Sequence, residues 1–490
     1  MDASKAAAID RRTLLATTGS ALLAMSGSAR AEDKPPAAES RKLSELIADF
    51  VVGFDLKSAP PLALERTRLA FTDTMGVMLA GSREKVAEIA CEMVKQEGAA
   101  PAASVVGQSF RTSLQLAALA NGVAAHAMDY DFSSFMGQPT VPIIPALLPL
   151  AETTGASQAE VIAAYIVGFE VVARLARASP TQSRERGWHA VGTIGTTGAA
   201  AACARLLKLP AAAIPDVIGI SASLAGSITS NFGTMTKPLH AGQAARNGLM
   251  AALLGQRGFS ANPSALEGTN GYFKAFAGGL EVSFAPFHDL GQKLDIVERG
   301  FRPKLYPCGG LGHTAIDATL ELRPQLLPRI DDITGITAGI TRYASQRIGS
   351  KYPVSVENAK FSMPYVAAYT LVHGAPFLAA FTEEAIRDDK VRAAARLVSV
   401  AVDPEFADIF EDSPSRIVVT FRDGSKVEKL RYYASGTRQF PLTREQIERK
   451  FMDCAVHAVS KETATRLFAL LQTLGQGPSF EAFWPLVRGA

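Results

Sequence analysis

The strongest constraint in this 490-residue sequence is a change in the pattern of apolar residues near residue 280. Before that point, apolar residues recur at helical spacing, as in the run from Leu43 to Val51, which follows the i, i+3, i+4, i+7, i+8 pattern of an amphipathic helix. Gly and Ala often occupy the packed side of the segments that follow to about residue 276, which lets helices approach closely. We therefore expect a compact, all-helical domain over residues 41–279.

Residues 280–436 have a different pattern. The runs "GITAGITRYA", "RLVSVAVD" and "SRIVVTFRDGSKVEKLRYYA" are β-branched and partly alternating, and Asp423-Gly424 lies between two runs as a hairpin signal. Helical stretches lie between them, so we predict a smaller α+β domain of ordinary size. Residues 437–490 become helical again, with Thr443 and Gln446 in a capping-box pattern, and are expected to return to the helical domain. The predicted fold class is mainly α.

The N-terminus carries an export pattern. Arg11-Arg12 precede a short apolar stretch that ends in Ala29-Arg30-Ala31, the order typical of a twin-arginine signal peptide over residues 1–31. The stretch is too short and too rich in Gly, Ser and Thr for a membrane span. We predict export by the twin-arginine translocase of a bacterium, cleavage after Ala31, and a periplasmic or otherwise exported protein whose mature form does not span the membrane. The alternative is a disordered basic leader.

Composition excludes several classes of function. The net charge is only +3, and the sequence has no Lys/Arg run of the kind that binds nucleic acid. Its four cysteines lack zinc or iron–sulfur spacing, and it has no HExxH, GxGxxG or Walker motif, so we expect neither a metal nor a cofactor. Buried free thiols are favoured over disulfides for the cysteines.

Two of four unusual polar stretches lie in the first half of the chain. In "NGVAAHAMDYDFSSFMGQPT", helical spacing places His126 and Asp129 on one face, with Asp131 near the expected helix end; a capping cluster is an equal alternative. In "RERGWHAVGTIGTTGAA", His189 precedes a Gly/Thr-rich helix entry and is a candidate general acid–base. The alternative, usually better for a lone histidine, is a buried ring bonded to a backbone carbonyl.

The other two stretches carry lysines. In "TMTKPLHAGQAARNG", Lys237 precedes Pro238 and is expected at or near a helix N-cap, where an ammonium is misplaced unless an anion joins it. A solvated loop lysine is the alternative. In "RPKLYPCGGLGHTAID", Lys304, Tyr306 and His313 surround a Pro-Cys-Gly-Gly turn at the domain junction, where they are placed to close over a ligand. Together these groups indicate an anionic organic substrate, because a carboxylate pairs with lysine.

Six ordered motifs resemble the MmgE/PrpD family, which includes 2-methylcitrate dehydratase, cis-aconitate decarboxylase and iminodisuccinate epimerase. The motifs are "NGVAAHAMDYD", "GWHAVGTIGTTGAAAA", "NFGTMTKPLHAGQAARNG", "LEGTNGYFKAF", "KLYPCGGLGHTAIDA" and "AKFSMPYVAAY". The resemblance implies a large helical domain, a smaller α+β lid, a cleft between them and a homodimer. It also implies cofactor-independent chemistry on small di- or tricarboxylates.

The resemblance also assigns candidate site residues. It implies catalytic roles for His189, Lys237, Asp129 and Lys304, of which the lysines face the substrate, and it places Ser133 near a family threonine. Substrate binding is further expected of residues in the same motifs: Gln138, Tyr306 and His313.

The sequence departs from the family pattern at three positions. Gln138 stands where members with lyase activity usually have a histidine, and glutamine cannot shuttle a proton. Cys308-Gly309 replace a histidine found in some members, and Phe132 replaces a second carboxylate. The leading hypothesis is a lyase of the dehydratase or decarboxylase type. An isomerase or epimerase with the same site and a non-catalytic carboxylate-binding protein are the alternatives.

Overall fold

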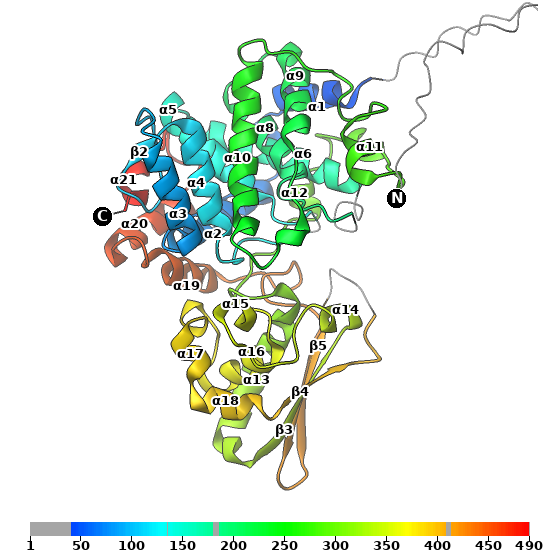
Figure 1. Ribbon diagram of the computed structural model, residues 1–490, viewed down its shortest axis with the longest axis vertical. Coiled ribbons are helices and arrows are strands. Elements are labelled where there is room, and N and C mark those ends of the chain that lie inside the picture. The colour runs from blue at the N-terminus through cyan, green and yellow to red at the C-terminus, as the bar shows by residue number, and fades with distance from the viewer. Residues whose placement is uncertain (1–40, 135, 180–185, 408–412, 490) are drawn as a thin grey trace, which may run out of the picture. The chain divides into compact units, whose positions relative to one another are not determined.

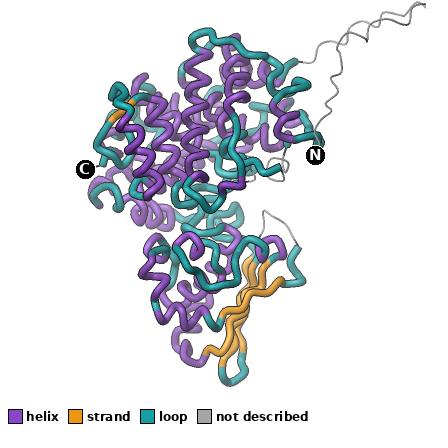
Figure 2. Tube along the Cα trace, in the orientation of Figure 1, coloured by secondary structure: helices purple, strands orange, loops and turns teal. Residues whose placement is uncertain are grey.

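The computed structural model describes residues 41–134, 136–179, 186–407 and 413–489. The predicted signal peptide therefore lies outside the described residues. Helices dominate the rest, with one small mixed sheet near residues 333–431 (Figures 1 and 2). Within the described ranges, no helix is both long and apolar enough to cross a membrane.

The first part of the chain is a packed set of helices. Their bounds are α1 Leu43–Gly53, α2 Pro61–Gly81, α3 Lys85–Gln96, α4 Leu114–His126, α5 Thr140–Thr154, α6 Gln158–Ala178, α8 Ile194–Leu206, α9 Ile214–Leu224, α10 Thr236–Gly255, α11 Tyr272–Ala277 and α12 Asp295–Glu298. The all-helical expectation misses one small feature. Two short strands, β1 (Ala103–Ser104) and β2 (Arg111–Thr112), pair antiparallel between α3 and α4.

Small residues bring the central helices together, as their abundance predicts. A Cβ added to Gly122 of α4 would lie 2.6 Å from the Cα of Gly242 of α10. A Cβ on Gly168 of α6 would lie 2.7 Å from the carbonyl oxygen of Gly198 of α8. Real Cβ atoms do not approach backbone this closely, so both crossings depend on glycine. The first crossing brings α4 close to α10, and the polar residues described below lie at the end of α4 and the start of α10.

The α+β part surrounds a four-stranded sheet. Its elements are α13 His313–Leu326, β3 Ile333–Ile340, α14 Arg342–Ser345, α15 Val356–Ala359, α16 Met363–His373, α17 Glu383–Arg387, α18 Asp389–Ala395, β4 Val398–Val402, β5 Ser415–Phe421 and β6 Lys426–Arg431. The strand order is β4-β3-β5-β6, with β3 and β4 parallel and the other pairs antiparallel. The predicted hairpin is confirmed between β5 and β6, where Gly424 has a φ of 81°.

The chain end packs against the helices of the first part. Its helices are α19 Arg444–Ala455, α20 Lys461–Gln472 and α21 Trp484–Val487. The capping box of Thr443 and Gln446 is confirmed at the start of α19. Phe451 of α19 lies against Gly76 of α2, where an added Cβ would meet its ring at 3.2 Å. The predicted domain limits at 279/280 and 436/437 stay predictions.

Candidate active site

The backbone at Asp129 departs from the expected helix. α4 ends at His126, and Asp129 has a φ of 54°, in the left-handed region that aspartate tolerates better than most residues. The prediction that His126 and Asp129 share a helical face is therefore wrong, because the helix ends before Asp129. The left-handed turn instead presents the Asp129 carboxylate to two lysines from other parts of the chain.

Asp129, Lys237 and Lys304 form one charged group, here called the Asp129 cluster. Lys237 Nζ lies 2.6 Å from Asp129 Oδ1, and Lys304 Nζ lies 2.9 Å from Oδ2. Lys304 Nζ also donates to the Asp129 carbonyl oxygen at 2.5 Å. The Asp129 side chain is 18% exposed and that of Lys304 only 5%. One carboxylate therefore compensates two largely buried ammonium groups, which leaves a net positive charge for an anion.

The environment of Asp129 favours its charged form. Burial alone would raise the pKa of Asp129, but the positive charges of Lys237 and Lys304, a smaller contribution from His126 and the hydrogen bond from Lys237 outweigh it. The pKa of Asp129 is therefore held below its usual range. Asp129 is a fixed anion at any ordinary pH, suited to position cations and unsuited to carry protons.

Lys237 lies one step inside α10 and not at its N-cap. The helix runs Thr236–Gly255 with Met235 as N-cap, so Lys237 lies near the N-cap as predicted, and the expected anion is present as Asp129. The Lys237 ammonium also lies 5.6 Å from the centre of the Phe232 ring. This contact with an aromatic face and the ion pair exclude the solvated-loop alternative.

His189 precedes α8, in a turn that enters the helix as predicted. Its ring is buried, and its Nδ1 lies 2.9 Å from Nδ1 of His240 on α10. Its side-chain partner is thus a second imidazole and not a backbone carbonyl. Burial, reinforced by the charges of His126, Lys237 and His240, lowers the pKa of His189 to about 2. His189 is therefore a neutral imidazole in the substrate-free protein.

His126 completes the set of imidazoles around His189. Its ring stacks on that of His189, with centroids 5.7 Å apart and an interplanar angle of 27°. Its Nδ1 lies 2.9 Å from Asp131 Oδ1, and both side chains are fully buried. His126, His189 and His240 are called the imidazole cluster below. The cluster adjoins the Asp129 cluster, because His126 and Lys237 both act electrostatically on His189.

Ser133 and Gln138 lie on the loop that follows Asp129. The backbone of Ser133 exchanges two hydrogen bonds with Arg302, at 2.9 and 2.7 Å, which holds the Lys304 segment beside the Asp129 loop. Gln138 is half-buried next to Gly137, where an added Cβ would lie 3.3 Å from the Cβ of Ala190. Both residues thus flank the clusters, and their substrate contact stays a prediction.

Tyr306 and His313 lie deeper in the α+β part than the other candidates. The Tyr306 hydroxyl donates to Asp317 Oδ1 at 2.7 Å, and His313 Nε2 donates to the Cys308 carbonyl oxygen at 3.3 Å. Both side chains are buried, with their rings packed edge to face. Burial, followed by the charge of Arg302, keeps the pKa of His313 well below its usual value. Substrate binding by these two residues stays a prediction.

The structure accounts for the glycine at position 309. A Cβ added there would lie 2.9 Å from Ile348 Cδ1 and 3.0 Å from the Phe361 ring. The space that a histidine would need is therefore filled by two apolar side chains. All four cysteines lie among the described residues and are buried and free, which confirms the interpretation as buried thiols.

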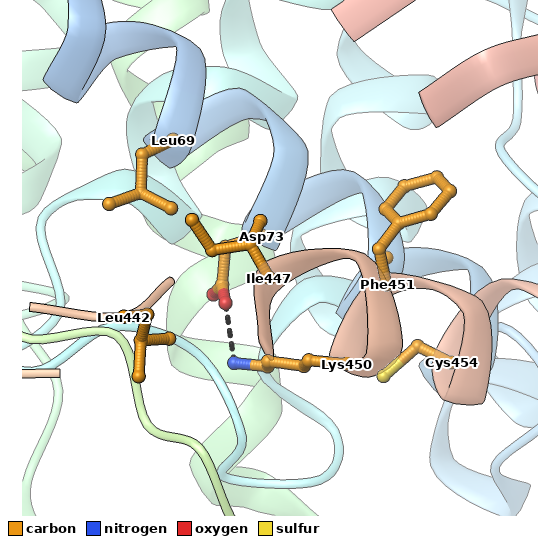
Figure 3. Close-up of a pocket in the computed structure, with 8 residues that line it drawn as sticks. Leu69, Asp73, Leu442, Ile447, Lys450, Phe451 and Cys454 are labelled. Atoms are coloured by element: carbon orange, nitrogen blue, oxygen red, sulfur yellow. Dashed lines mark ion pairs between the residues drawn. The ribbon is translucent and has the colours of Figure 1, made fainter. Parts of the chain in front are cut away.

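A buried ion pair, drawn in Figure 3, is connected by hydrogen bonds to the backbone next to Asp129. Lys450 of α19 and Asp73 of α2 approach to 2.5 Å, next to a cavity of about 10 Å³. The Lys450 ammonium also donates to the carbonyl oxygens of Tyr130 and Lys304, at 2.8 and 2.7 Å. These two residues adjoin or belong to the Asp129 cluster. The helix α19 therefore holds in place the backbone that carries the Asp129 cluster.

Sequence reasoning left several of these residues out of the candidate site. His240 follows Lys237 by three positions within one quoted motif, and His126 and Asp131 lie in another, so their spacing was a usable signal. Lys450 gave none, because it bonds to Tyr130 from 320 positions away.

Comparisons with known proteins identify the family of the chain. Residues 45–285 match the MmgE/PrpD N-terminal domain, and residues 306–476 match the MmgE/PrpD C-terminal domain. The chain belongs to the MmgE/PrpD family. The two matches leave residues 286–305 between them, a segment that contains α12 and Lys304 and ends just before the turn that carries Gly309.

Related MmgE/PrpD proteins match over most of their length. The chain is 27% identical to human cis-aconitate decarboxylase, over 92% of this chain and 95% of that protein. It is 25% identical to the mouse cis-aconitate decarboxylase, over 92% and 94%. The cis-aconitate decarboxylase of Aspergillus terreus is 27% identical, over 81% of this chain and 86% of the relative.

Proposed function

We propose that this protein is a lyase that removes carbon dioxide from a small di- or tricarboxylate, with cis-aconitate as the first candidate. The Asp129 cluster carries the proposal, because two ammonium groups share one carboxylate in a largely buried site. The cluster has cation capacity left for a substrate carboxylate. The names of the relatives support a decarboxylase in particular.

The lowered pKa of His189 favours decarboxylation over proton abstraction. A group whose pKa is lowered to about 2 by burial and neighbouring cations is a weak base in the free protein. Dehydration and epimerisation both begin by taking a proton from carbon. Decarboxylation does not, because the carbon–carbon bond breaks and leaves its electron pair on carbon. One proton must then be delivered to that carbon.

The proposed roles follow from charge. Lys237 and Lys304 bind substrate carboxylates and stabilise the negative charge that develops when carbon dioxide leaves. Asp129 holds the two ammonium groups in place. His189 is proposed to exchange a proton with a carboxyl group of the substrate beside the reacting carbon, because binding of a polyanion offsets the cations that depress its pKa. Gln138 and Ser133 are proposed to bind substrate oxygens from the flanking loop.

The decisive experiment incubates the mature protein, residues 32–490, with cis-aconitate and other di- and tricarboxylates in heavy water. Proton NMR is expected to show loss of one carboxyl group and one deuterium on a carbon of the product. Loss of water would identify a dehydratase, and deuterium without a change of skeleton would identify an isomerase. Binding of the panel without exchange or product would identify the carboxylate-binding protein. Each of these three results would overturn the decarboxylase.

The chemistry is proposed to need no cofactor, because the sequence has no cofactor motif. Dialysis against a chelator, followed by the same assay, is expected to leave turnover unchanged. A loss of turnover that returns with an added metal ion would contradict this part of the proposal.

Export and assembly are proposed on the sequence pattern and the family. The twin-arginine pattern supports translocation to the periplasm and a mature chain that begins at Glu32. Mass spectrometry of the protein from a bacterial periplasm tests the cleavage site, and an intact leader on all recovered protein would contradict it. A homodimer is expected in solution, with light scattering as the measurement.

A further inference from the structure

The two ring nitrogens of the buried His126 differ in their hydrogen bonding. One edge is bonded, since Nδ1 lies 2.9 Å from Asp131 Oδ1. On the other edge, Nε2 is buried and finds no hydrogen-bond partner among the described residues. The second oxygen of Asp131, Oδ2, is buried and unpaired in the same sense. An unpaired buried polar atom destabilises a fold, so its presence beside a candidate site points to a ligand or a reaction that uses it.

The bond to Asp131 fixes the chemistry of the free edge. A carboxylate only accepts hydrogen bonds, so the shared hydrogen belongs to Nδ1 of His126. Nε2 then carries a lone pair when the ring is neutral and an N–H when the ring is protonated. The carboxylate stabilises the positive charge of the protonated ring, as in other sites where an acid group orients a histidine.

The helix packing places His126 at the site. Gly122 meets Gly242 where α4 crosses α10, and His126 lies one turn further along α4 on the same face. From that face its ring stacks on His189, and its charge acts on Asp129, His189 and His240. His126 is therefore within the group of side chains that surrounds the reacting region.

We propose that His126, oriented by Asp131, is a catalytic acid of this site. The inference rests on the proposed decarboxylation. After the carbon–carbon bond breaks, the electron pair on carbon takes the proton from Nε2, and the electrons of the N–H bond stay on the imidazole. The ring takes another proton from water before the next turnover. This residue would perform the proton transfer that Gln138 cannot perform.

The other two imidazoles are less suited to this step. His189 and His240 bond to each other through Nδ1, so each relies on a neutral partner. In the imidazole cluster, His126 is the residue that bonds to a carboxylate, that of Asp131. A proton on His126 is therefore held by an adjacent negative charge, while a proton on His189 faces mainly other cations.

The first test is nitrogen NMR of the full mature protein labelled with ¹⁵N-histidine. Seven histidines give few signals, and His126→Gln assigns the one of interest. We expect His126 to have its hydrogen on Nδ1 when neutral and its Nε2 signal to shift when cis-aconitate is added. Asp131→Asn is expected to change the tautomer. A His126 signal that keeps its hydrogen on Nε2, or ignores cis-aconitate while His189 responds, would overturn the proposal.

The second test is kinetic and separates this proposal from the proposed function. On cis-aconitate, His126→Gln and Asp131→Asn are expected to lower kcat by about 10²–10⁴, with KM changed only a few-fold. Asp131→Asn is also expected to change the pH dependence of kcat, which a purely structural role would not do. Exposed His457→Gln is the matched control. Active wild type with fully active His126→Gln overturns the His126 role alone, whereas inactive wild type overturns the cis-aconitate function and leaves the NMR test to decide.

Discussion

Two carboxylates that each meet a lysine differ in the direction of their pKa shift. Asp129 meets two ammonium groups and keeps its side chain 18% exposed, and its pKa is lowered. Asp73 meets one ammonium group and is 3% exposed, and burial raises its pKa to about 6 despite Lys450. Lys450 divides its donors between Asp73 and two backbone carbonyls. The balance between burial and the number of neighbouring cations therefore decides whether the pKa of the carboxylate is raised or lowered.

The difference separates two tasks. Asp129 remains an anion and organises cations where a substrate must bind. Asp73 is a structural group whose charge is only partly compensated by Lys450 (Figure 3). The Lys450 ammonium also bonds to the backbone of Tyr130 and Lys304. A site of this kind needs a fixed charge that faces the substrate and a backbone that other contacts hold in position.

The largest expected effect comes from removing a lysine from the Asp129 cluster. Lys304→Met takes away the ammonium that contacts both an oxygen of the Asp129 carboxylate and its carbonyl oxygen. We expect kcat/KM on cis-aconitate to fall by about 10³ or more, because charge stabilisation in a buried site is worth several kcal/mol. Steady-state kinetics beside the exposed control Lys208→Met measures it. A loss below tenfold would show that Lys304 does not stabilise the reaction.

The second prediction breaks the Asp73–Lys450 pair. Lys450→Met leaves a buried carboxylate without its cation and is expected to lower the free energy of unfolding by about 3–5 kcal/mol. Asp73→Asn/Lys450→Met removes both charges and should recover part of that loss. Urea unfolding of the two single variants and the double variant forms a cycle. Additive effects within about 0.5 kcal/mol would mean that the pair is not coupled.

Local signals and long-range contacts differed in what the sequence could predict. The hairpin at Gly424 and the capping box at Thr443 follow from neighbouring residues, so short-range chemistry was enough to predict them. The motif residues Asp129, His189, Lys237 and Lys304 do lie together, and their roles stay predictions.

Errors arose where tertiary contacts outweighed local pattern. The spacing predicted that the helix which begins at Leu114 continues through Asp129. The helix α4 instead ends at His126, and Asp129 adopts a left-handed conformation in which its carboxylate contacts two lysines. The support from Lys450 could not be predicted, since a lysine within a polar helix segment carries no sign of its distant partners.

The third prediction uses pH to compare the two carboxylates. Because the folded pKa of Asp73 is raised from 3.8 to about 6, its contribution to stability is full below about pH 4 and is lost as pH rises through 6. The change is about 3 kcal/mol. Asp129 has the opposite sign, since its lowered pKa gives stability above about pH 4 that is lost as pH falls.

Difference curves isolate these two contributions from other titrating groups. The unfolding free energy of wild type minus that of Asp73→Asn should fall between pH 4 and pH 7. The unfolding free energy of wild type minus that of Asp129→Asn should fall as pH drops below 4. Urea titrations at matched pH values measure both curves. Parallel curves for the two variants would contradict the opposite signs.

The smallest expected effect comes from restoring the histidine of related lyases, Gln138→His. The flanking loop lies against Ala190, next to His189, so a new imidazole would lie near the imidazole cluster. If His126 already supplies the proton, the gain in kcat on cis-aconitate should stay within about fivefold, because a second acid does not speed a step that the first completes. In a His126→Gln background, the same change should restore part of the lost rate. A large gain in the wild-type background would instead mean that the native site lacks an effective acid.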